Sequence, residues 1–248
     1  MTFLIDIKNV SLTFSGAEKV ILSDINYQVK KGDFVIILGS NGSGKSSLLK
    51  LLSRQHQPCT GMISVEGSGL NSYPGKKLSR HVKTLTQNCH ESLFTSLTVL
   101  ENYLLVKQCY EPNLFALKNK GDRAYFAEYL LKFNVNLAAK LDQMVEQLSG
   151  GEKQALALAL TVLYPPRILL LDEHTSALDP VSAERLMLLT QQVAEEFRIT
   201  CFLATHDLGI AEKYGNRILA LQNGKIHHEI ERSDSGILNQ KSLLAACY

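Results

Sequence analysis

Residues 34–52 read Phe34-Val-Ile-Ile-Leu-Gly39-Ser-Asn-Gly-Ser-Gly44-Lys45-Ser46-Ser-Leu-Leu-Lys-Leu-Leu52. The stretch opens with a continuous apolar run, which predicts a buried strand of a parallel sheet. The leucines near its end, Leu48, Leu49 and Leu52, fall on one face of a helix. The glycine-rich turn between them matches the spacing GxxxxGK[ST]. This order of strand, turn and helix predicts an α/β fold that holds phosphate groups in the turn.

The composition of the turn suits a bound nucleotide. Its glycines let backbone N–H groups point inward, and the following helix adds the positive end of its dipole. We expect Lys45 to reach the β- and γ-phosphates and the Ser46 hydroxyl to bind Mg²⁺. The predicted nucleotide contacts here are Gly39, Ser40, Asn41, Gly42, Ser43, Gly44, Lys45, Ser46 and Ser47.

The pattern on either side of this stretch predicts how the chain is organised. Alternating strands near the N-terminus predict an antiparallel β region, and aromatic and leucine residues at helical spacing predict an inserted helical subdomain. We therefore expect a single domain, 1–248, with an α/β phosphate-loop NTPase core. Its predicted parts are the core at 1–87 and 148–230, the helical subdomain at 88–147 and a C-terminal tail at 231–248.

Two acidic residues, Asp172 and Glu173, follow the apolar run Ile168–Leu171. In phosphate-loop enzymes, the acid that closes such a strand helps to hold Mg²⁺, which assigns that role to Asp172. Glu173 would lie at the carboxyl end of the strand, where it could accept a proton from an attacking water molecule. Two acidic residues at the end of a strand are often only a solvent-exposed pair. The phosphate loop in the same chain favours the catalytic interpretation.

The segment Leu148-Ser-Gly-Gly-Glu-Lys-Gln154 precedes a predicted helix and resembles the signature of the ATP-binding-cassette (ABC) ATPases. The resemblance spans nearly the whole chain, and its pieces occur in the family order. It implies that Ser149, Gly150 and Gly151 contact the γ-phosphate of ATP held by another subunit. The chain has one phosphate loop and one signature, so a second copy or a paralogous ATPase would complete a head-to-tail dimer.

The resemblance also implies roles for four further residues. Gln87, after the strand Val82–Thr86, would sense the γ-phosphate or Mg²⁺, and His206 would contact the γ-phosphate. Asp179 would communicate across the dimer. Phe14 would stack under the adenine ring, with an ordinary core position as an equal alternative. The implied catalytic residues are Glu173, His206, Gln87 and Lys45, and the implied Mg²⁺ ligands are Ser46, Gln87 and Asp172.

One residue departs from the family pattern, because His174 stands where most members have proline. The sequence Asp-Glu-His-Thr resembles a subgroup of bacterial ATPases paired with permeases of the branched-chain-amino-acid type. Histidine relaxes the backbone restriction of proline and adds a titratable group beside Glu173. We expect a spacer or local hydrogen-bonding role for it; a catalytic role is the alternative.

Composition narrows the setting in which such an ATPase works. The formal net charge of +2 is too small to predict a protein that coats nucleic acid. Five scattered cysteines, none in a CxxC pair, predict a reducing cytosol and neither a disulfide framework nor a zinc site. We found no signal peptide and no apolar run of about 20 residues that could span a bilayer.

The family resemblance implies the ATP-hydrolysing subunit of a transporter, cytoplasmic and peripheral on the inner face of the cell membrane. Its implied partners are an integral membrane permease, docked around Asn88–Asn102, and a substrate-binding protein. Within that segment, Leu97–Asn102 resembles the stretch that follows Gln87 in the family. A separate cassette favours import. Two alternatives stay open: a soluble ABC ATPase of an assembly machine, such as iron–sulfur cluster biogenesis, or one of nucleic-acid maintenance.

Overall fold

The computed structural model describes residues 3–13, 20–86, 88, 92–112 and 120–232. The chain divides into two compact units. The first comprises residues 1–84, 166–173 and 194–248, and the second comprises residues 85–165 and 174–193. The predicted subdivision at residues 88 and 147 stays a prediction.

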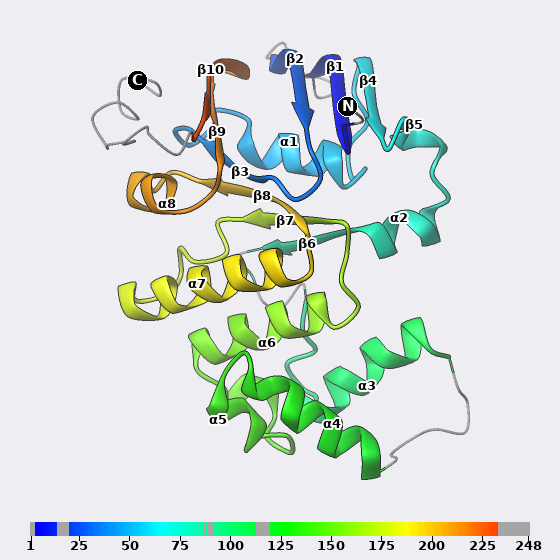
Figure 1. Cartoon of the computed structure of the whole chain (residues 1–248), viewed down its shortest axis with the longest axis vertical. Helices are drawn as coiled ribbons and strands as arrows, with labels where there is room; N and C mark the ends of the chain where they lie inside the picture. The colour runs from blue at the N-terminus through cyan, green and yellow to red at the C-terminus, as the bar shows by residue number, and fades with distance from the viewer. Residues whose placement is uncertain (1–2, 14–19, 87, 89–91, 113–119, 233–248) are drawn as a thin grey trace. The chain divides into compact units, whose positions relative to one another are not determined.

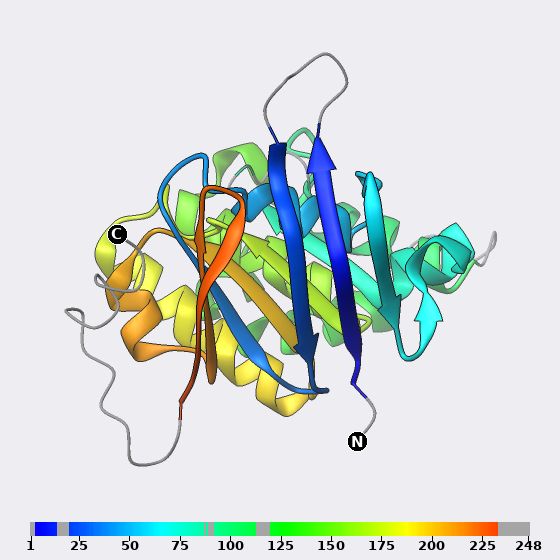
Figure 2. The same ribbon diagram turned by 90° about the horizontal axis from the view of Figure 1, so that it is seen from above.

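An antiparallel sheet forms one layer of the first unit, in the strand order β2-β1-β4-β5 (Figure 2). Its strands are β1 (Ile5–Thr13), β2 (Val20–Val29), β4 (Thr60–Val65) and β5 (Ser68–Gly69). In β1, Ile5, Ile7, Val10 and Leu12 are buried while most residues between them face outward. This alternation is typical of a sheet with one covered face, as predicted for the N-terminal region.

The second sheet has the strand order β10-β9-β3-β8-β7-β6. Its strands are β3 (Phe34–Leu38), β6 (Val82–Thr86), β7 (Ile168–Asp172), β8 (Thr200–Thr205), β9 (Arg217–Gln222) and β10 (Lys225–Glu231). Strands β9, β3, β8 and β7 are parallel neighbours. Every residue of β3 and β8 is buried, as expected for strands covered on both faces. The carboxyl ends of β3, β7 and β8 therefore meet at one edge.

Strand β10 pairs with β9 in antiparallel register through the Asn223-Gly224 turn. Both turn residues have positive φ, 49° and 76°, as a two-residue hairpin of this type requires. A side chain at Gly224 would also lie 2.2 Å from the Ile21 carbonyl oxygen, so only glycine fits there. This close approach fixes the hairpin against β2.

Helix α1 (Lys45–Leu52) lies between the two sheets of the first unit (Figure 1). Its residues Leu48, Leu49, Leu51 and Leu52 belong to one apolar cluster that includes side chains from both sheets. Packing on two sides fixes the axis of α1 and therefore the direction in which its N-terminus points.

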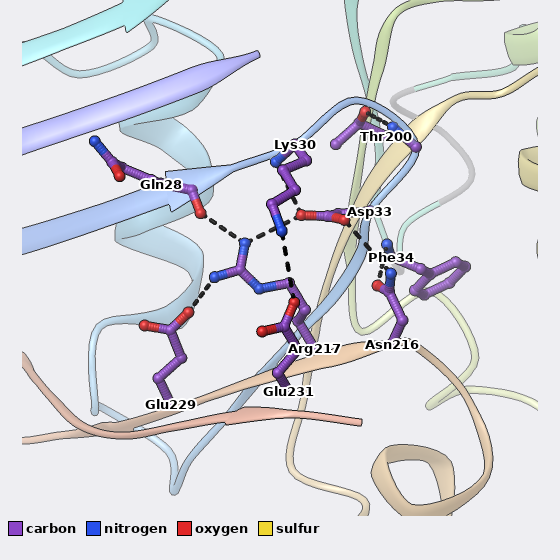
Figure 3. Close-up of polar contacts among 10 residues, drawn as sticks. Gln28, Lys30, Asp33, Phe34, Thr200, Asn216, Arg217, Glu229 and Glu231 are labelled. Atoms are coloured by element: carbon purple, nitrogen blue, oxygen red, sulfur yellow. Dashed lines mark hydrogen bonds and ion pairs between the residues drawn. The ribbon is translucent and has the colours of Figure 1, made fainter. Parts of the chain in front are cut away.

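A network of charged side chains joins several strands at the N-terminal end of β3, opposite the phosphate loop (Figure 3). The Arg217 guanidinium donates to Asp33 Oδ2 at 3.0 Å and to the Gln28 carbonyl at 2.6 Å, and it pairs with Glu229. Arg217 and Asp33 are 11% and 10% exposed. Asn216 Oδ1 accepts from the Phe34 backbone N–H at 2.8 Å. One cation, mostly shielded from solvent, thus holds β2, β3, β9 and β10 together.

Helices make up most of the second unit. They are α3 (Val99–Tyr110), α4 (Lys120–Leu131), α5 (Val135–Ala138), α6 (Gly150–Val162) and most of α7 (Pro180–Glu196), with a 3₁₀ turn, η3 (Val145–Gln147). Tyr103 of α3 stacks on the fully buried Phe126 of α4, with ring centroids 4.2 Å apart. Thr98 and Glu101 form a capping box that begins α3.

Short helices complete the first unit: η1 (Leu70–Ser72), α2 (Gly75–His81) and α8 (Leu208–Lys213). Within the described ranges, no helix is both long and apolar enough to cross a membrane.

Candidate nucleotide site

The predicted phosphate loop follows β3 and leads directly into α1. Gly42 and Gly44 have φ of 79° and 107°, in the region that favours glycine. A side chain at Gly39 would lie 2.3 Å from the Leu221 carbonyl oxygen, so that position excludes one as well. The loop conformation therefore depends on three of its glycines.

The N-terminus of α1 is available to an anion. Gly44 occupies the N-cap position without a side-chain cap, and the first turn contains no acidic residue. Ser43 is 3% exposed, and among the described residues its Oγ has no hydrogen-bond partner. Uncapped backbone amides and a buried, unsatisfied hydroxyl are the groups that a phosphate would satisfy. The loop therefore fits the phosphates of a nucleotide.

Lys45 folds back over this loop. Its Nζ donates to the Gly39 and Ser40 carbonyls at 2.8 and 3.1 Å and lies 3.9 Å from Glu173 Oε1. Burial lowers the pKa of Lys45, and the nearby Glu173 and Asp172 carboxylates oppose that shift. A desolvated ammonium beside the loop is poised to exchange carbonyl contacts for phosphate oxygens.

Ser46 and Asp172 meet across neighbouring elements, with Ser46 Oγ donating to Asp172 Oδ1 at 3.0 Å. Burial raises the pKa of the Asp172 carboxyl, while the hydrogen bond from Ser46 opposes the shift. A hydroxyl and a carboxylate are hard oxygen donors of the kind that Mg²⁺ prefers alongside phosphate oxygens and water. The pair therefore fits the predicted Mg²⁺ ligands, and that role stays a prediction.

Glu173 and His206 lie at the carboxyl ends of the adjacent strands β7 and β8. His206 Nδ1 is 3.1 Å from Glu173 Oε1. The Glu173 backbone N–H donates to the Ala204 carbonyl at 3.1 Å, and Glu173 has a φ of 47°, which is uncommon for a residue other than glycine. The sequence predicted both residues but not their contact, because strand order is not readable from one chain.

The predicted signature lies in the second unit and begins α6. Ser149 Oγ accepts from the Glu152 N–H at 3.3 Å, and Glu152 Oε2 accepts from the Ser149 N–H at 3.0 Å. A side chain at Gly150 would lie 3.5 Å from its nearest neighbour and one at Gly151 3.4 Å, which are near ordinary contacts. The fold of the chain therefore has little need of these glycines, which suits a close approach from another molecule.

The Ser149 capping box could have been predicted from its Ser-x-x-Glu spacing in the sequence. Asp179 Oδ1 accepts from the Val181 and Ser182 backbone N–H groups at 3.1 and 3.0 Å. A hydrogen bond from the Ser182 side chain, together with those from the Ser182 and Val181 backbone N–H groups, lowers the pKa of Asp179. Asp179 thus caps α7, a structural role beside the predicted one.

Phe14 and Gln87 lie outside the described residues, so their predicted roles stay predictions. The remaining candidates fall into two groups. The first unit brings together Lys45, Ser46, Asp172, Glu173 and His206, and the second holds Ser149, Gly150, Gly151 and Asp179. Among the described residues, no group of three or more His, Cys, Asp or Glu side chains is arranged to hold a metal ion.

Comparison with known proteins identifies the family. A family model described as ABC transporter matches residues 22–176. The chain belongs to that family. It is an ABC ATPase, and the α/β fold predicted from its sequence is confirmed by solved structures of the same architecture.

Curated relatives match this ABC ATPase over nearly its full length. A phosphonates import ATP-binding protein PhnC of Staphylococcus epidermidis is 34% identical, covering 93% of this chain and 90% of the relative. A tyrosine transport ATP-binding protein of Clostridioides difficile is 31% identical, covering 97% of both chains. A methionine import ATP-binding protein MetN 1 of Staphylococcus aureus is 31% identical, covering 90% of this chain and 64% of its own length.

Two solved structures resemble the ABC ATPase. CbiO1 from Clostridium perfringens, part of the ABC transporter complex cbiONQ, has a TM-score of 0.81 at 23% identity and covers 99% of this chain and 92% of its own. The ATP-binding cassette MJ0796 has a TM-score of 0.75 at 29% identity, covering 92% and 99%. That structure is a dimer in a post-hydrolysis state, bound to ADP and phosphate.

Proposed function

We propose that this ABC ATPase is the energy-supplying subunit of an importer, and that it works as a head-to-tail pair on the inner face of the cell membrane. The partner in the pair is a second copy or a paralogous ATPase. The pair drives a separate membrane permease, to which a substrate-binding protein delivers the transported molecule. Helix α3 and the residues before it, around Asn88–Asn102, receive the permease.

The observation that carries the proposal is the likeness, over at least 90% of the chain, to proteins named for transport or import. Their names include phosphonates, tyrosine and methionine. Because these three differ chemically, they support import as the activity and do not select one substrate. The dimeric MJ0796 structure supports the pairing.

The geometry of the first unit supports hydrolysis of the bound nucleotide. Glu173 accepts a proton from the attacking water, and His206, 3.1 Å away, orients its carboxylate. An ionised carboxylate accepts hydrogen bonds only, so His206 Nδ1 carries the proton of that contact. Lys45 moves from the loop carbonyls to the phosphates, where its charge stabilises the transferring group.

Other residues of the two units bind the metal ion and the γ-phosphate. Ser46 and Asp172 would hold Mg²⁺, which would supply positive charge where the β- and γ-phosphates bind. Ser149 and the amides of Gly150 and Gly151 bind the γ-phosphate from the partner subunit. Loss of the γ-phosphate removes the contacts that both subunits share, so hydrolysis favours the open pair.

Replacement of Glu173 by Gln tests this proposal. Glu173→Gln removes the base while keeping the shape of the side chain, so ATP binding persists and kcat falls by about 10²–10⁴-fold. The pair then stays closed on ATP. The variant should therefore be purified with ATP from detergent-solubilised membranes of its own cell, and its partners identified by mass spectrometry.

A permease recovered in stoichiometric amount with the Glu173→Gln protein supports the transporter proposal, and its own sequence narrows the substrate. Recovery of soluble scaffold proteins or nucleic acid alone contradicts transport but leaves the ATPase assignment intact. Near wild-type turnover by Glu173→Gln contradicts the assignment of the base. Lys45→Ala, which loses nucleotide, is the control for ATP-dependent capture.

A further inference from the structure

His174 follows Glu173 in the chain and is fully buried within the second unit. Its Nε2 lies 3.4 Å from Oγ1 of Thr190, a residue of α7 that is also fully buried. The Thr190 hydroxyl in turn donates to the Leu186 carbonyl at 2.7 Å. The ring of His174 therefore joins a hydrogen-bonded chain that ends on the backbone of α7.

The direction of these hydrogen bonds follows from proton counting. A hydroxyl has one proton, and Thr190 donates it in the hydrogen bond to the Leu186 carbonyl. Thr190 Oγ1 is thus an acceptor toward the ring, and His174 Nε2–H is the donor. His174 Nδ1 then has no proton, and within the described ranges it has no hydrogen-bond partner. The contact with Thr190 is the ring's polar anchor in the described structure.

Glu173 and His174 are held by different units, because the boundary between the units falls on the peptide bond that joins them. The Glu173 backbone is bonded to the Ala204 carbonyl of β8, and its φ of 47° is unfavourable for a residue with a side chain. Such a conformation persists only where its surroundings enforce it. The hydrogen bond to the Ala204 carbonyl fixes the backbone N–H of Glu173. The buried ring of His174 fixes the backbone that follows Glu173.

Proline at position 174 could not make the contact with Thr190, since it has no polar side chain. It would also drive residue 173 toward an extended conformation and away from the φ observed here. Histidine therefore combines two properties at this position: it permits the left-handed conformation of Glu173 and supplies a buried donor that anchors the following peptide.

We propose that His174 is a positioning residue for Glu173, and that the hydrogen bond from its Nε2–H to Thr190 couples the conformation of the catalytic base to helix α7. The inference rests on the proposed role of Glu173 and deepens it. Helix α7 begins at the Asp179 cap, so a change at that cap reaches Glu173 through Thr190 and His174.

Paired substitutions at both ends of the hydrogen bond test the anchor. His174→Leu removes the donor and His174→Gln retains an N–H donor; Thr190→Val removes the acceptor and Thr190→Ser retains it. We expect His174→Leu and Thr190→Val each to lower kcat at least tenfold with less than a twofold change in the KM for ATP. His174→Gln and Thr190→Ser restore kcat to within about threefold of wild type.

The double variant His174→Leu/Thr190→Val should lose no more kcat than either single one, because both break the same bond. Hydrogen exchange of the peptide spanning residues 171–176 supplies a readout besides activity. It should quicken in His174→Leu and Thr190→Val and stay slow in His174→Gln. If His174→Leu fails to fold, the Thr190→Val and Thr190→Ser pair carries the test.

Phe126→Leu, in the aromatic core of the second unit, controls for a loss of stability. Equal losses of kcat in Phe126→Leu and His174→Leu at matched Tm would show a structural role only and overturn the inference. Unchanged kcat in His174→Leu and Thr190→Val would overturn it too, as would losses confined to KM. Glu173→Gln separates the failure of the proposed base from the failure of the role of His174. If Glu173→Gln retains turnover, the assignment of the base is wrong. If Glu173→Gln loses turnover while His174→Leu and Thr190→Val keep it, only the role of His174 is wrong.

Discussion

At the scale of single residues, the environment of His174 has a consequence for stability as well as for catalysis. Burial lowers the pKa of His174 to about 4, well below its ordinary value. The unfolded chain therefore binds a proton more readily than the folded one between about pH 6.5 and 4. The stability that this neutral ring contributes is fully present above that window and is lost as the pH falls through it.

We predict that the free energy of unfolding falls by about 2 kcal/mol more in the wild type than in His174→Gln between pH 7.5 and 5. Urea denaturation at several pH values measures the difference. Burial also lowers the pKa of His81, but His81 is present in both proteins, so its contribution cancels in the difference. Parallel pH profiles for wild type and His174→Gln would contradict the prediction.

The residues that sequence reasoning placed in the site were those with a fixed spacing and a physical reason for it. The loop from Gly39 to Ser46 could be predicted because glycine, lysine and serine each meet a distinct requirement of a bound phosphate. The contact between Glu173 and His206 could not, since it depends on β7 lying beside β8. The burial of His174 was equally hidden, because a single histidine has no pattern.

At the scale of elements, two short strands could be predicted with their observed bounds. The predicted bounds Phe34–Leu38 and Val82–Thr86 are those of β3 and β6. The short helices α2 and α8, of 7 and 6 residues, were not predicted. Such lengths span fewer than two turns, too few for a helical period to stand out.

Helix α6 has a cap with two proposed functions, and a second capped helix separates them. Ser149→Ala should lower the free energy of unfolding by about 1 kcal/mol and also lower ATPase activity at least tenfold, because Ser149 is proposed to bind the γ-phosphate. Asn134 caps α5 through the Asn136 N–H at 2.9 Å. Asn134→Ala should lose a similar amount of stability, again about 1 kcal/mol, and keep its activity. Equal losses of activity in Ser149→Ala and Asn134→Ala would show that Ser149 only caps α6 and does not bind the γ-phosphate.

The Arg217 network should stabilise the strands far more than exposed ion pairs do (Figure 3). Arg217→Ala leaves the Asp33 carboxylate buried without its cation, which should cost about 3–5 kcal/mol of unfolding free energy. The exposed Lys30–Glu231 pair, at 3.8 Å, is the matched control. Lys30→Ala should cost less than about 1 kcal/mol in the same denaturation experiment. A loss below 1 kcal/mol for Arg217→Ala would contradict a structural role for the network.

At the scale of the whole molecule, the proposed head-to-tail pair makes each ATP site from the phosphate loop of one subunit and the signature of the other. Lys45→Ala and Ser149→Ala should each keep at most about a tenth of wild-type activity alone. Mixed in equal amounts, half of the pairs are hybrids, and each hybrid contains one intact loop facing one intact signature. ATPase activity should therefore recover to roughly one quarter of wild type if sites act independently.

A mixture of Lys45→Ala with a Lys45→Ala/Ser149→Ala double variant contains no intact site and should stay inactive. Absence of recovery in the first mixture, with hybrid pairs shown to form, would contradict a shared site between identical subunits.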